Sequence, residues 1–482
     1  MRVKTLWLTD FRSYESAEVA FAPGLTAILG PNGHGKTNLL EALGYLATLG
    51  SFRGAPNDAL IRAGAEHAVV RAEGTRDGRD LLLEAEIVDG GRNRIFLNRQ
   101  KLPRARDLLG ALRVTVFSPD DLALVKGGPA GRRAFLDDVL VSLHPRFDAL
   151  QAETERILRQ RNALLKQCAG GSRFDESAAY TLDVWDTKFA EAGTALAEAR
   201  SDLVERLRPA IGAAYTALAS SPVGAHPVDA RYDAPWMAEG LAAALAASRA
   251  DDLRRGVTLV GPHRDDLVLS LGALPAKGYA SHGESWSVAL ALRLASYDLL
   301  RNESTGDLSP EDAAPVLILD DVFAELDTGR RERLASVVAD APQVLITAAV
   351  ADDVPGALSG ARYDVMAGRV TRRPQRQGRT WCGPRSTGRV PTRRNGRRPT
   401  PPGRAPVPPP MRGPCGPSGP GPRARAASAV SRPPSATSSP GWWAIAAGSA
   451  TSPSPGSPRA GRPSPVPTSP PTAGRCRCAT AP

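Results

Sequence analysis

The segment Gly30-Pro31-Asn32-Gly33-His34-Gly35-Lys36-Thr37 constrains the fold of this chain more than any other stretch. It matches the pattern G-x-x-x-x-G-K-[ST] at every fixed position. The apolar run 25–29 before it predicts a strand, and the helix-forming run 38–43 after it predicts a helix. A glycine-rich turn in that position directs backbone N–H groups toward phosphate oxygens, next to the positive end of the helix dipole. The segment therefore predicts a phosphate-binding loop that runs from Gly30 through Asn38 in an α/β fold.

A second apolar strand, predicted over residues 315–319, ends in Asp320 and Asp321, which is the pattern of a Walker B element. We expect Lys36 to place a point charge on the β- and γ-phosphates of the nucleotide. Thr37 and Asp320 then provide the oxygen ligands for Mg²⁺. Asp321 is expected to orient or deprotonate the attacking water. Lys36 and Asp321 are therefore the candidate catalytic residues.

Two further segments are typical of ABC-type ATPases. Ser281-His282-Gly283-Glu284 precedes a predicted helix over 287–300 and resembles a degenerate signature motif of the form S-x-G-Q. Taken alone, Ser-x-Gly before a helix is typical of an N-cap. Its position between the two Walker elements favours a signature instead, with Ser281, Gly283 and Glu284 facing a nucleotide held by a second protomer. Residues 324–327 resemble a D-loop, with Glu325 and Asp327 at the interface of the same dimer.

The net charge of +11 belongs entirely to the C-terminal segment, residues 371–482. That segment contains 19 arginines, no Lys, Asp or Glu, and 26 of the 43 prolines. The rest of the chain has 42 basic and 50 acidic residues, so its net charge does not predict nucleic-acid binding. The segment contains too few apolar residues for a core, and we expect it to be disordered. It is either a basic arm that touches nucleic acid or an out-of-frame translation of GC-rich DNA. The complete lack of acidic residues favours the second explanation.

Cysteine and hydropathy patterns point to a cytoplasmic protein. Cys168 is the one cysteine outside the C-terminal segment, which suits a reducing compartment and excludes a disulfide framework. Residues 1–7 lack the apolar stretch of a signal peptide, and no run approaches the ~20 apolar residues that span a bilayer. We therefore expect a soluble protein that makes no membrane contact.

The coarse pattern of elements predicts a divided domain. Strands are expected over 3–8, 19–21 and 25–29, followed by an antiparallel meander made of 67–72, 81–87, 94–97 and 114–117. Helices are expected from 132 to about 219, with a hairpin broken at 169–172. Strand character returns at 257–260, 267–271 and 343–347. The predicted parts are residues 1–128 (N-terminal part of an ATPase head), 129–254 (inserted helical arm), 255–370 (C-terminal part of the head) and 371–482 (tail). The fold class is an α/β (α+β) P-loop ABC-type head with an inserted helical lobe.

The sequence resembles the RecF family, the bacterial recombination and gap-repair ATPases in the SMC-like branch of ABC ATPases. Besides the Walker elements, the similar segments are 8–14, 51–54, 117–122, 132–137, 160–162, 261–267 and 320–327. The resemblance implies a head built from both parts of the chain and an ATP-dependent homodimer. It also implies ATP-dependent binding to DNA, with preference for duplex beside a single-stranded gap. RecO and RecR are the implied partners in loading RecA.

Some positions depart from the ABC pattern or have an open role. Glu284 stands where glutamine is usual, Asp321 where glutamate is common, and Thr347 where transporters have a switch histidine, which suggests slow turnover suited to a timed clamp. Arg12 and Arg53 lie either on a solvated face or near the nucleotide. His263 and Arg264 either touch DNA or order a turn. Candidate DNA contacts are Arg132, Arg133, Arg156, Arg159 and Arg161.

Two other functions fit the Walker elements. One is the ATPase subunit of a transporter, which the long helical insertion argues against. The other is a structural DNA clamp without ATPase activity, which the intact Lys36, Thr37, Asp320 and Asp321 argue against.

Overall fold

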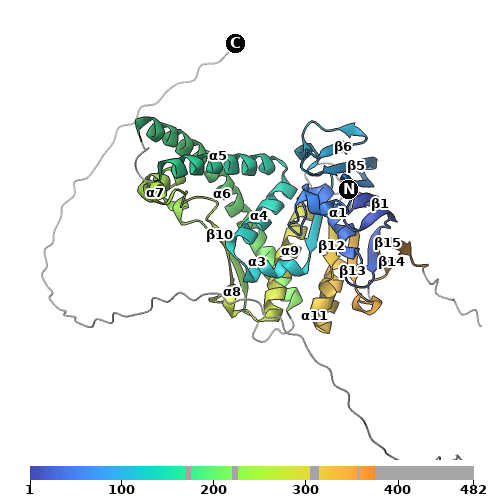
Figure 1. The fold of residues 1–482 in the computed structure, drawn as a ribbon. Coiled ribbons are helices and arrows are strands. Elements are labelled where there is room, and N and C mark those ends of the chain that lie inside the picture. The colour runs from blue at the N-terminus through green and yellow to red at the C-terminus, as the bar shows by residue number, and fades with distance from the viewer. Residues whose placement is uncertain (170–174, 220–225, 304–313, 357, 375–482) are drawn as a thin grey trace, which may run out of the picture. The chain divides into compact units, whose positions relative to one another are not determined.

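The computed structural model describes residues 1–169, 175–219, 226–303, 314–356 and 358–374 (Figure 1). All of them belong to one compact unit, Met1–Arg385. Residues 371–372, which the prediction assigned to the tail at 371–482, belong to strand β15 (Arg369–Arg372). The part of that tail beyond residue 374, and residues 170–172 of the helix break expected at 169–172, lie outside the described residues. The predicted disorder of the tail therefore stays a prediction.

A six-stranded, mostly parallel sheet positions the predicted phosphate loop. Its strand order is β15 (Arg369–Arg372), β14 (Gly360–Met366), β3 (Gly24–Leu29), β13 (Gln343–Ala348), β12 (Val316–Asp320) and β8 (Val114–Phe117). All neighbours pair in parallel except β14 and β15. Because β13 lies between β3 and β12, its Thr347 pairs with Ile28 on one side and Asp320 on the other. The strand before the loop and the strand before the carboxylates are thus separated by a single strand, β13.

Both faces of this sheet are covered, which explains why its strands are continuous apolar runs. Ile28, Ile318 and Leu345 share a core with α1 (Lys36–Thr48). Residues on the other face, such as Leu317 and Ile346, pack with α9 (His282–Asn302) and α11 (Thr328–Val338).

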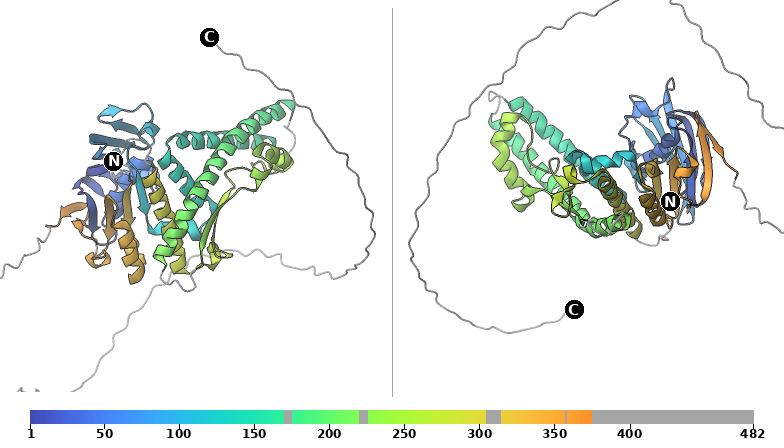
Figure 2. Two further views of the ribbon diagram at one scale, coloured as in Figure 1. Left: turned by 180° about the vertical axis from the view of Figure 1, so that it is seen from behind. Right: turned by 90° about the horizontal axis from the view of Figure 1, so that it is seen from below.

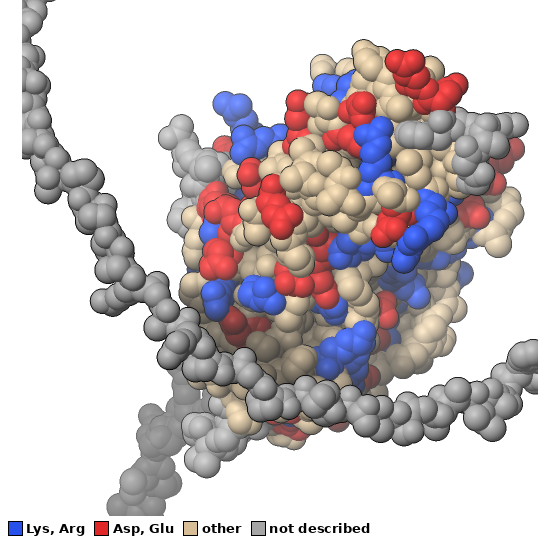
Figure 3. Space-filling view, turned by 90° about the vertical axis from the view of Figure 1, so that its left-hand side faces the viewer, with Lys and Arg blue, Asp and Glu red and all other residues tan. Residues whose placement is uncertain are grey.

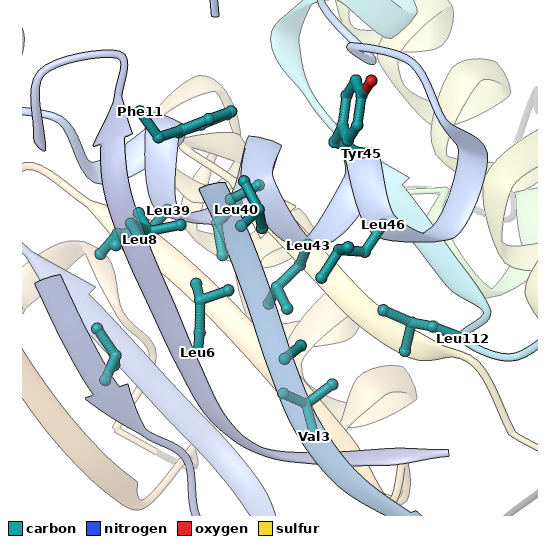
Figure 4. Packing of buried hydrophobic residues seen from close by; sticks show 14 of the residues in the cluster. Val3, Leu6, Leu8, Phe11, Leu39, Leu40, Leu43, Tyr45, Leu46 and Leu112 are labelled. Carbon is teal, nitrogen blue, oxygen red and sulfur yellow. The ribbon is translucent and has the colours of Figure 1, made fainter. Parts of the chain in front are cut away.

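An antiparallel sheet packs on the far side of α1. Its order is β2 (Tyr14–Ala20), β1 (Arg2–Phe11), β4 (His67–Arg76), β5 (Arg79–Val88), β6 (Arg94–Leu97) and β7 (Gln100–Lys101). Figure 4 shows Leu39, Leu40 and Leu43 of α1 lying against Leu6 and Leu8 of β1, and all five are buried. The expected meander is wrong in its last strand. Residues 114–117 form β8, which pairs in parallel with β12. The prediction failed because four residues of strand character do not indicate which strand they pair with.

Long helices follow the antiparallel sheet in sequence. They are α4 (Pro129–Leu143), α5 (Arg146–Cys168), α6 (Glu176–Leu218) and α7 (Leu241–Arg255). α5 and α6 lie side by side, and the 43-residue α6 continues from there to contact α9 and α11 (Figures 1 and 2). The predicted helical region is therefore confirmed. We call α5, α7 and the adjoining part of α6 the arm.

A three-stranded sheet packs on α6, and the sequence did not predict this sheet as a unit. Its order is β11 (Leu274–Pro275), β10 (Asp266–Leu271) and β9 (Val228–Asp233). Because β9 pairs with β10, this sheet crosses the predicted boundary at 254/255, and the domain boundaries stay predictions. The strand expected at 257–260 is wrong. The N–H groups of Thr258 and Leu259 bond to the side chains of Asn162 and Asp252 instead of to another strand.

Short elements complete the described chain. They are α2 (Asn57–Leu60), α3 (Leu122–Lys126), α8 (Ala276–Tyr279), η1 (Ala105–Leu108), η2 (Pro119–Asp121), η3 (Pro235–Ala238), η4 (Val322–Glu325) and η5 (Ala351–Asp353). Among the helices of the described residues, none has the length and apolar character required to cross a membrane.

Candidate functional site

The loop between β3 and α1 has a shape that favours glycine at three positions. Gly30, Gly33 and Gly35 have φ values of 153°, 80° and 105°. A Cβ on Gly30 would lie 2.2 Å from the carbonyl oxygen of Val365, and a Cβ on Gly35 would lie 2.7 Å from Ser13 Oγ. Backbone conformation and lack of space therefore both require glycine at positions 30 and 35, whereas at Gly33 the backbone conformation alone favours it. The fixed positions of the sequence pattern thus have a direct structural cause.

Lys36 is the first residue of α1, and its side chain is buried. Its Nζ lies 3.0 Å from Asn32 Oδ1, 3.5 Å from the carbonyl oxygen of Pro31 and 3.7 Å from Asp321 Oδ2. Within the described chain no side chain caps α1, and the first turn of the helix contains no acidic residue. The end of the helix therefore presents a buried ammonium group and uncapped N–H groups, which is an arrangement suited to an anion.

The two carboxylates at the end of β12 are fixed by hydroxyl groups from two directions. Thr37 Oγ1 donates to Asp320 Oδ1 at 2.9 Å, and Thr347 Oγ1 donates to the same atom at 2.7 Å. Thr347 Oγ1 also accepts the N–H of Asp321 at 2.8 Å, which holds Asp321 in a left-handed conformation with φ of 52°. Burial raises the pKa of Asp320 above its ordinary value, and the hydrogen bonds from both threonines partly offset this.

A cavity of about 180 Å³ lies over the loop. The residues that line it are Asn32, Gly33, Gly35, Lys36, Thr37, Asn38, Arg53 and Asp321. The structure thus brings together most of the residues predicted for the phosphates, the metal and the water. Of the two uncertain arginines, Arg53 lines the cavity. Arg12 instead makes a bidentate ion pair with the buried Glu41 of α1, at 2.6 and 2.8 Å.

Other predicted loop residues face neighbouring segments. His34 Nδ1 accepts the N–H of Ala367 at 3.1 Å, and Gly30 packs under β14. Sequence reasoning missed two contacts from the turn after β1. Tyr14 OH donates to the carbonyl oxygen of Gly35 at 2.9 Å, and Asn38 Nδ2 donates to Ser13 Oγ at 3.0 Å. The one sequence signal for them is that Ser13 and Tyr14 lie in a segment similar to RecF proteins.

The predicted signature residues are not among the described residues that line the cavity over the phosphate loop of their own chain. Ser281 is the N-cap of α9 and forms a reciprocal capping box with Glu284, through contacts of 3.3 and 2.8 Å. Hydrogen bonds from the side chain and the backbone N–H of Ser281 to the carboxylate lower the pKa of Glu284. The guanidinium group of Arg330 lies against Gly283, and Arg330 also binds Asp327, the N-cap of α11. The N-cap interpretation is therefore correct as local structure. The roles of Ser281, Gly283, Glu284, Glu325 and Asp327 toward a second protomer stay predictions.

Most of the arginines proposed for DNA are engaged inside the protein. Arg132 pairs with Asp266 at 2.7 Å, and Arg133 donates to the carbonyl oxygen of Asp265 at 2.8 Å. The fully buried Arg161 binds Asp186 at 2.6 Å and Asp252 at 2.8 Å. Arg156 and Arg159 are exposed on α5, where they pair with glutamates of the same helix.

The segment 261–267 contacts the helical region and does not line the cavity over the phosphate loop. Asp265 accepts from Tyr232 OH and Trp236 Nε1, both at 2.7 Å. Arg200 donates to the carbonyl oxygen of Pro262 and pairs with the buried Asp137. His263 Nε2 lies 3.0 Å from the carbonyl oxygen of Thr258, so of its two open interpretations the ordering of a turn is the one supported. We call this cluster the arm junction; it consists of Arg132, Arg133, Asp137, Arg161, Arg200, Asp252, Thr258, His263, Asp265 and Asp266.

A phosphate loop between a strand and a helix, with the carboxylates of another parallel strand beside it, defines a P-loop ATPase. Residues 2–362 match the family model "RecF/RecN/SMC N terminal domain". The chain belongs to this family, and its curated relatives identify it as a RecF-type member.

Two relatives illustrate the similarity. The DNA replication and repair protein RecF of Streptomyces avermitilis is 53% identical over 389 residues, which covers 77% of this chain and 100% of the relative. That of Beutenbergia cavernae is 52% identical over 398 residues, with the same coverage. Two solved structures of the recombination mediator protein RecF in the RecFOR pathway, one with ATP and one with ATPrS, give TM-scores of 0.69 and 0.68. They are 26% and 27% identical, and each covers 77% of this chain, with 97% and 98% of their own chains covered.

Proposed function

We propose that this chain is an ATP-dependent DNA-binding protein of recombinational gap repair and replication restart. The observation that carries the proposal is the convergence of Lys36, Thr37, Asp320 and Asp321 at one loop in a chain of the RecF family. Relatives that are 52–53% identical to it over the aligned 77% of the chain are DNA replication and repair proteins. Membership of this family also disfavours the transporter alternative.

ATP is the nucleotide we propose for the cavity, since RecF with ATP is a structural neighbour. The loop N–H groups and Lys36 would hold its phosphates. Thr37 and Asp320 fit Mg²⁺, because their oxygen atoms lie 2.9 Å apart and Mg²⁺ commonly binds one or two protein oxygens together with substrate phosphates and water. The metal would neutralise the charge that develops on the phosphates. A bound cation would also oppose the rise in the pKa of Asp320.

We propose that Asp321 acts on the attacking water rather than on the metal. Its side chain is 29% exposed and lies over the loop, and its N–H is held by Thr347. An aspartate reaches one methylene less far than a glutamate. We therefore propose hydrolysis slow enough to time a clamp, with turnover below the enzyme median of ~10 s⁻¹.

A second copy of the chain would complete the site. The start of α9 offers a hydroxyl, a glycine N–H and a helix dipole at Ser281 and Gly283, and neither residue lines the cavity of its own chain. We propose that they contact the γ-phosphate of the partner, so that ATP holds a homodimer on DNA. Duplex beside a single-stranded gap is the proposed substrate, with RecO, RecR and RecA as partners.

The test compares DNA binding with and without ATP. Gel shifts on gapped, duplex and single-stranded DNA should show ATP-dependent binding that is strongest on the gapped substrate, and light scattering should show a dimer under the same conditions. K36M should abolish both. A dimer that forms equally without ATP contradicts the switch. Absence of hydrolysis by a chain that still binds DNA would favour the structural clamp.

A further inference from the structure

Net charge does not show where DNA would bind, because residues 1–370 are acidic overall. Figure 3 shows the side of the molecule that carries the arm, and basic and acidic side chains are interspersed there. Arg132, Arg161 and Arg200 of the arm junction are neutralised by aspartates. A surface that binds DNA phosphates is therefore expected where cationic side chains locally outnumber carboxylates.

Such an excess occurs at the outer edge of the antiparallel sheet. A groove of about 770 Å³ is lined by residues of the β5–β6 turn, β6, β7, η1 and the start of α5. Five cationic side chains line it and all are exposed: Arg92, Arg94, Lys101, Arg104 and Arg106. Arg94 and Lys101 come from the two strands of the β6–β7 hairpin, and Arg92 comes from the turn before it. Arg104 and Arg106 come from the loop and the helix η1 that follow the hairpin.

The carboxylates near this groove do not neutralise it. Arg94 pairs with Glu86 at 2.6 Å, whereas Arg104 and Arg106 lie 3.4 and 3.6 Å from Asp107 and Asp148. Exposed pairs of that kind are weak, and a phosphate can replace them. Arg92 and Lys101 have no ion pair with any carboxylate in the described part of the chain. The groove thus keeps net positive charge.

The size of the groove and the residues that line it indicate which anionic ligand it fits. It is about four times as large as the cavity over the phosphate loop, so a single phosphate group would not fill it. None of the residues that line it is Phe, Tyr or Trp. Single-stranded DNA is usually held by stacking on aromatic side chains, and protein partners are usually anchored by aromatic residues. Arginine forks without aromatic residues match the phosphate backbone of a duplex.

We propose that this groove, formed by Arg92, Arg94, Lys101, Arg104 and Arg106, holds the phosphate backbone of duplex DNA. The inference rests on the proposed DNA-binding function and adds the surface that performs it. It also places the duplex on the antiparallel sheet that packs against α1, the helix that begins at Lys36.

The experiment measures how the affinity for a blunt duplex depends on NaCl concentration in the presence of ATP. Each phosphate contact contributes about 0.9 to the slope of log Kobs against log[salt]. The variant R92Q/K101Q/R104Q should therefore lower that slope by about 2–3, and R92K/K101R/R104K should keep it. Fluorescent ATP binding should be unchanged in both variants, because none of the three residues lines the nucleotide cavity.

The matched control is R208Q/R231Q/R254Q, which removes the same charge from exposed positions of α6, β9 and α7. It should leave the slope at the value of the unsubstituted chain. A groove variant with an unaltered slope, or one affected only on single-stranded DNA, overturns the groove while leaving DNA binding intact. If the unsubstituted chain binds no DNA with ATP, the proposed function itself fails, and the groove fails with it.

Discussion

The cavity over the phosphate loop and the arm junction are both rich in buried charge, but they use it in opposite ways. At the arm junction, Arg161 lies within 2.6–2.8 Å of two aspartates and Thr258. At the loop, Lys36 Nζ is 3.7 Å from Asp321 and is otherwise held by an amide and a carbonyl oxygen. Charges in the first cluster compensate one another, whereas those in the second retain the capacity to bind a ligand.

The difference shows that buried charge alone does not identify a binding site. A fully paired cluster fixes the positions of helices, and removing one partner leaves an uncompensated ion. An incompletely paired cluster beside a cavity tolerates substitution but loses its ligand. Four predictions test this distinction.

The largest effect is expected at Asp321. D321N keeps the size of the side chain but removes the base, so turnover should fall by about 10²–10⁴-fold. ATP affinity should remain within a few-fold, and the ATP-bound dimer should persist. Single-turnover hydrolysis together with equilibrium binding of labelled ATP provides the measurement. Undiminished turnover would remove Asp321 from the catalytic role.

At the arm junction, R161M should lower the free energy of unfolding by about 3–5 kcal/mol, because Asp252 would remain buried without its cation. Urea denaturation of the whole chain measures this, with R156M on the same helix as the exposed control. If the two variants were equally stable, the arm junction would not be the structural cluster described above.

K36M should show the reverse pattern. ATP affinity should decrease by at least about 100-fold, which corresponds to about 2.7 kcal/mol. The free energy of unfolding should change by less than about 1 kcal/mol, since a poorly paired ammonium is replaced by an apolar chain of similar length. Isothermal titration calorimetry and urea denaturation on the same sample test both parts. A large loss of stability would mean that Lys36 is structural.

The smallest effect is expected from pH. Burial lowers the pKa of His263 to about 4, and its Nδ1 is buried without a hydrogen-bond partner among the described residues. The unfolded chain, with a histidine pKa near 6.5, then binds the proton more readily. The contribution of the neutral His263 to the free energy of unfolding is therefore fully present above pH 6.5. It decreases by roughly 2–3 kcal/mol as the pH falls toward 4. H263Q should remove this part of the slope. H67Q, which changes an exposed histidine of β4, should retain it.

Much of the nucleotide site was predictable because its determinants are local. Residues 25–43 contain a strand, three glycines and a helix in sequence order, and each has a short-range cause. The strand before Asp320 was equally predictable from the sequence, because a parallel strand that is buried on both faces is a continuous apolar run. The role of Thr347 was not predictable. Its contacts with Asp320 and Asp321 depend on β13 lying beside β12.

The sequence alone determined the class of site, the family resemblance and the order of the main elements. Tertiary structure decided the partner of β8, the sheet formed by β9 and β10, and which arginines remain available to a ligand. Arg161 and Asp252 are 91 positions apart, and Arg132 and Asp266 are 134 apart. Such pairings depend on which helices pack together, and a pattern of neighbouring residues contains no record of that packing.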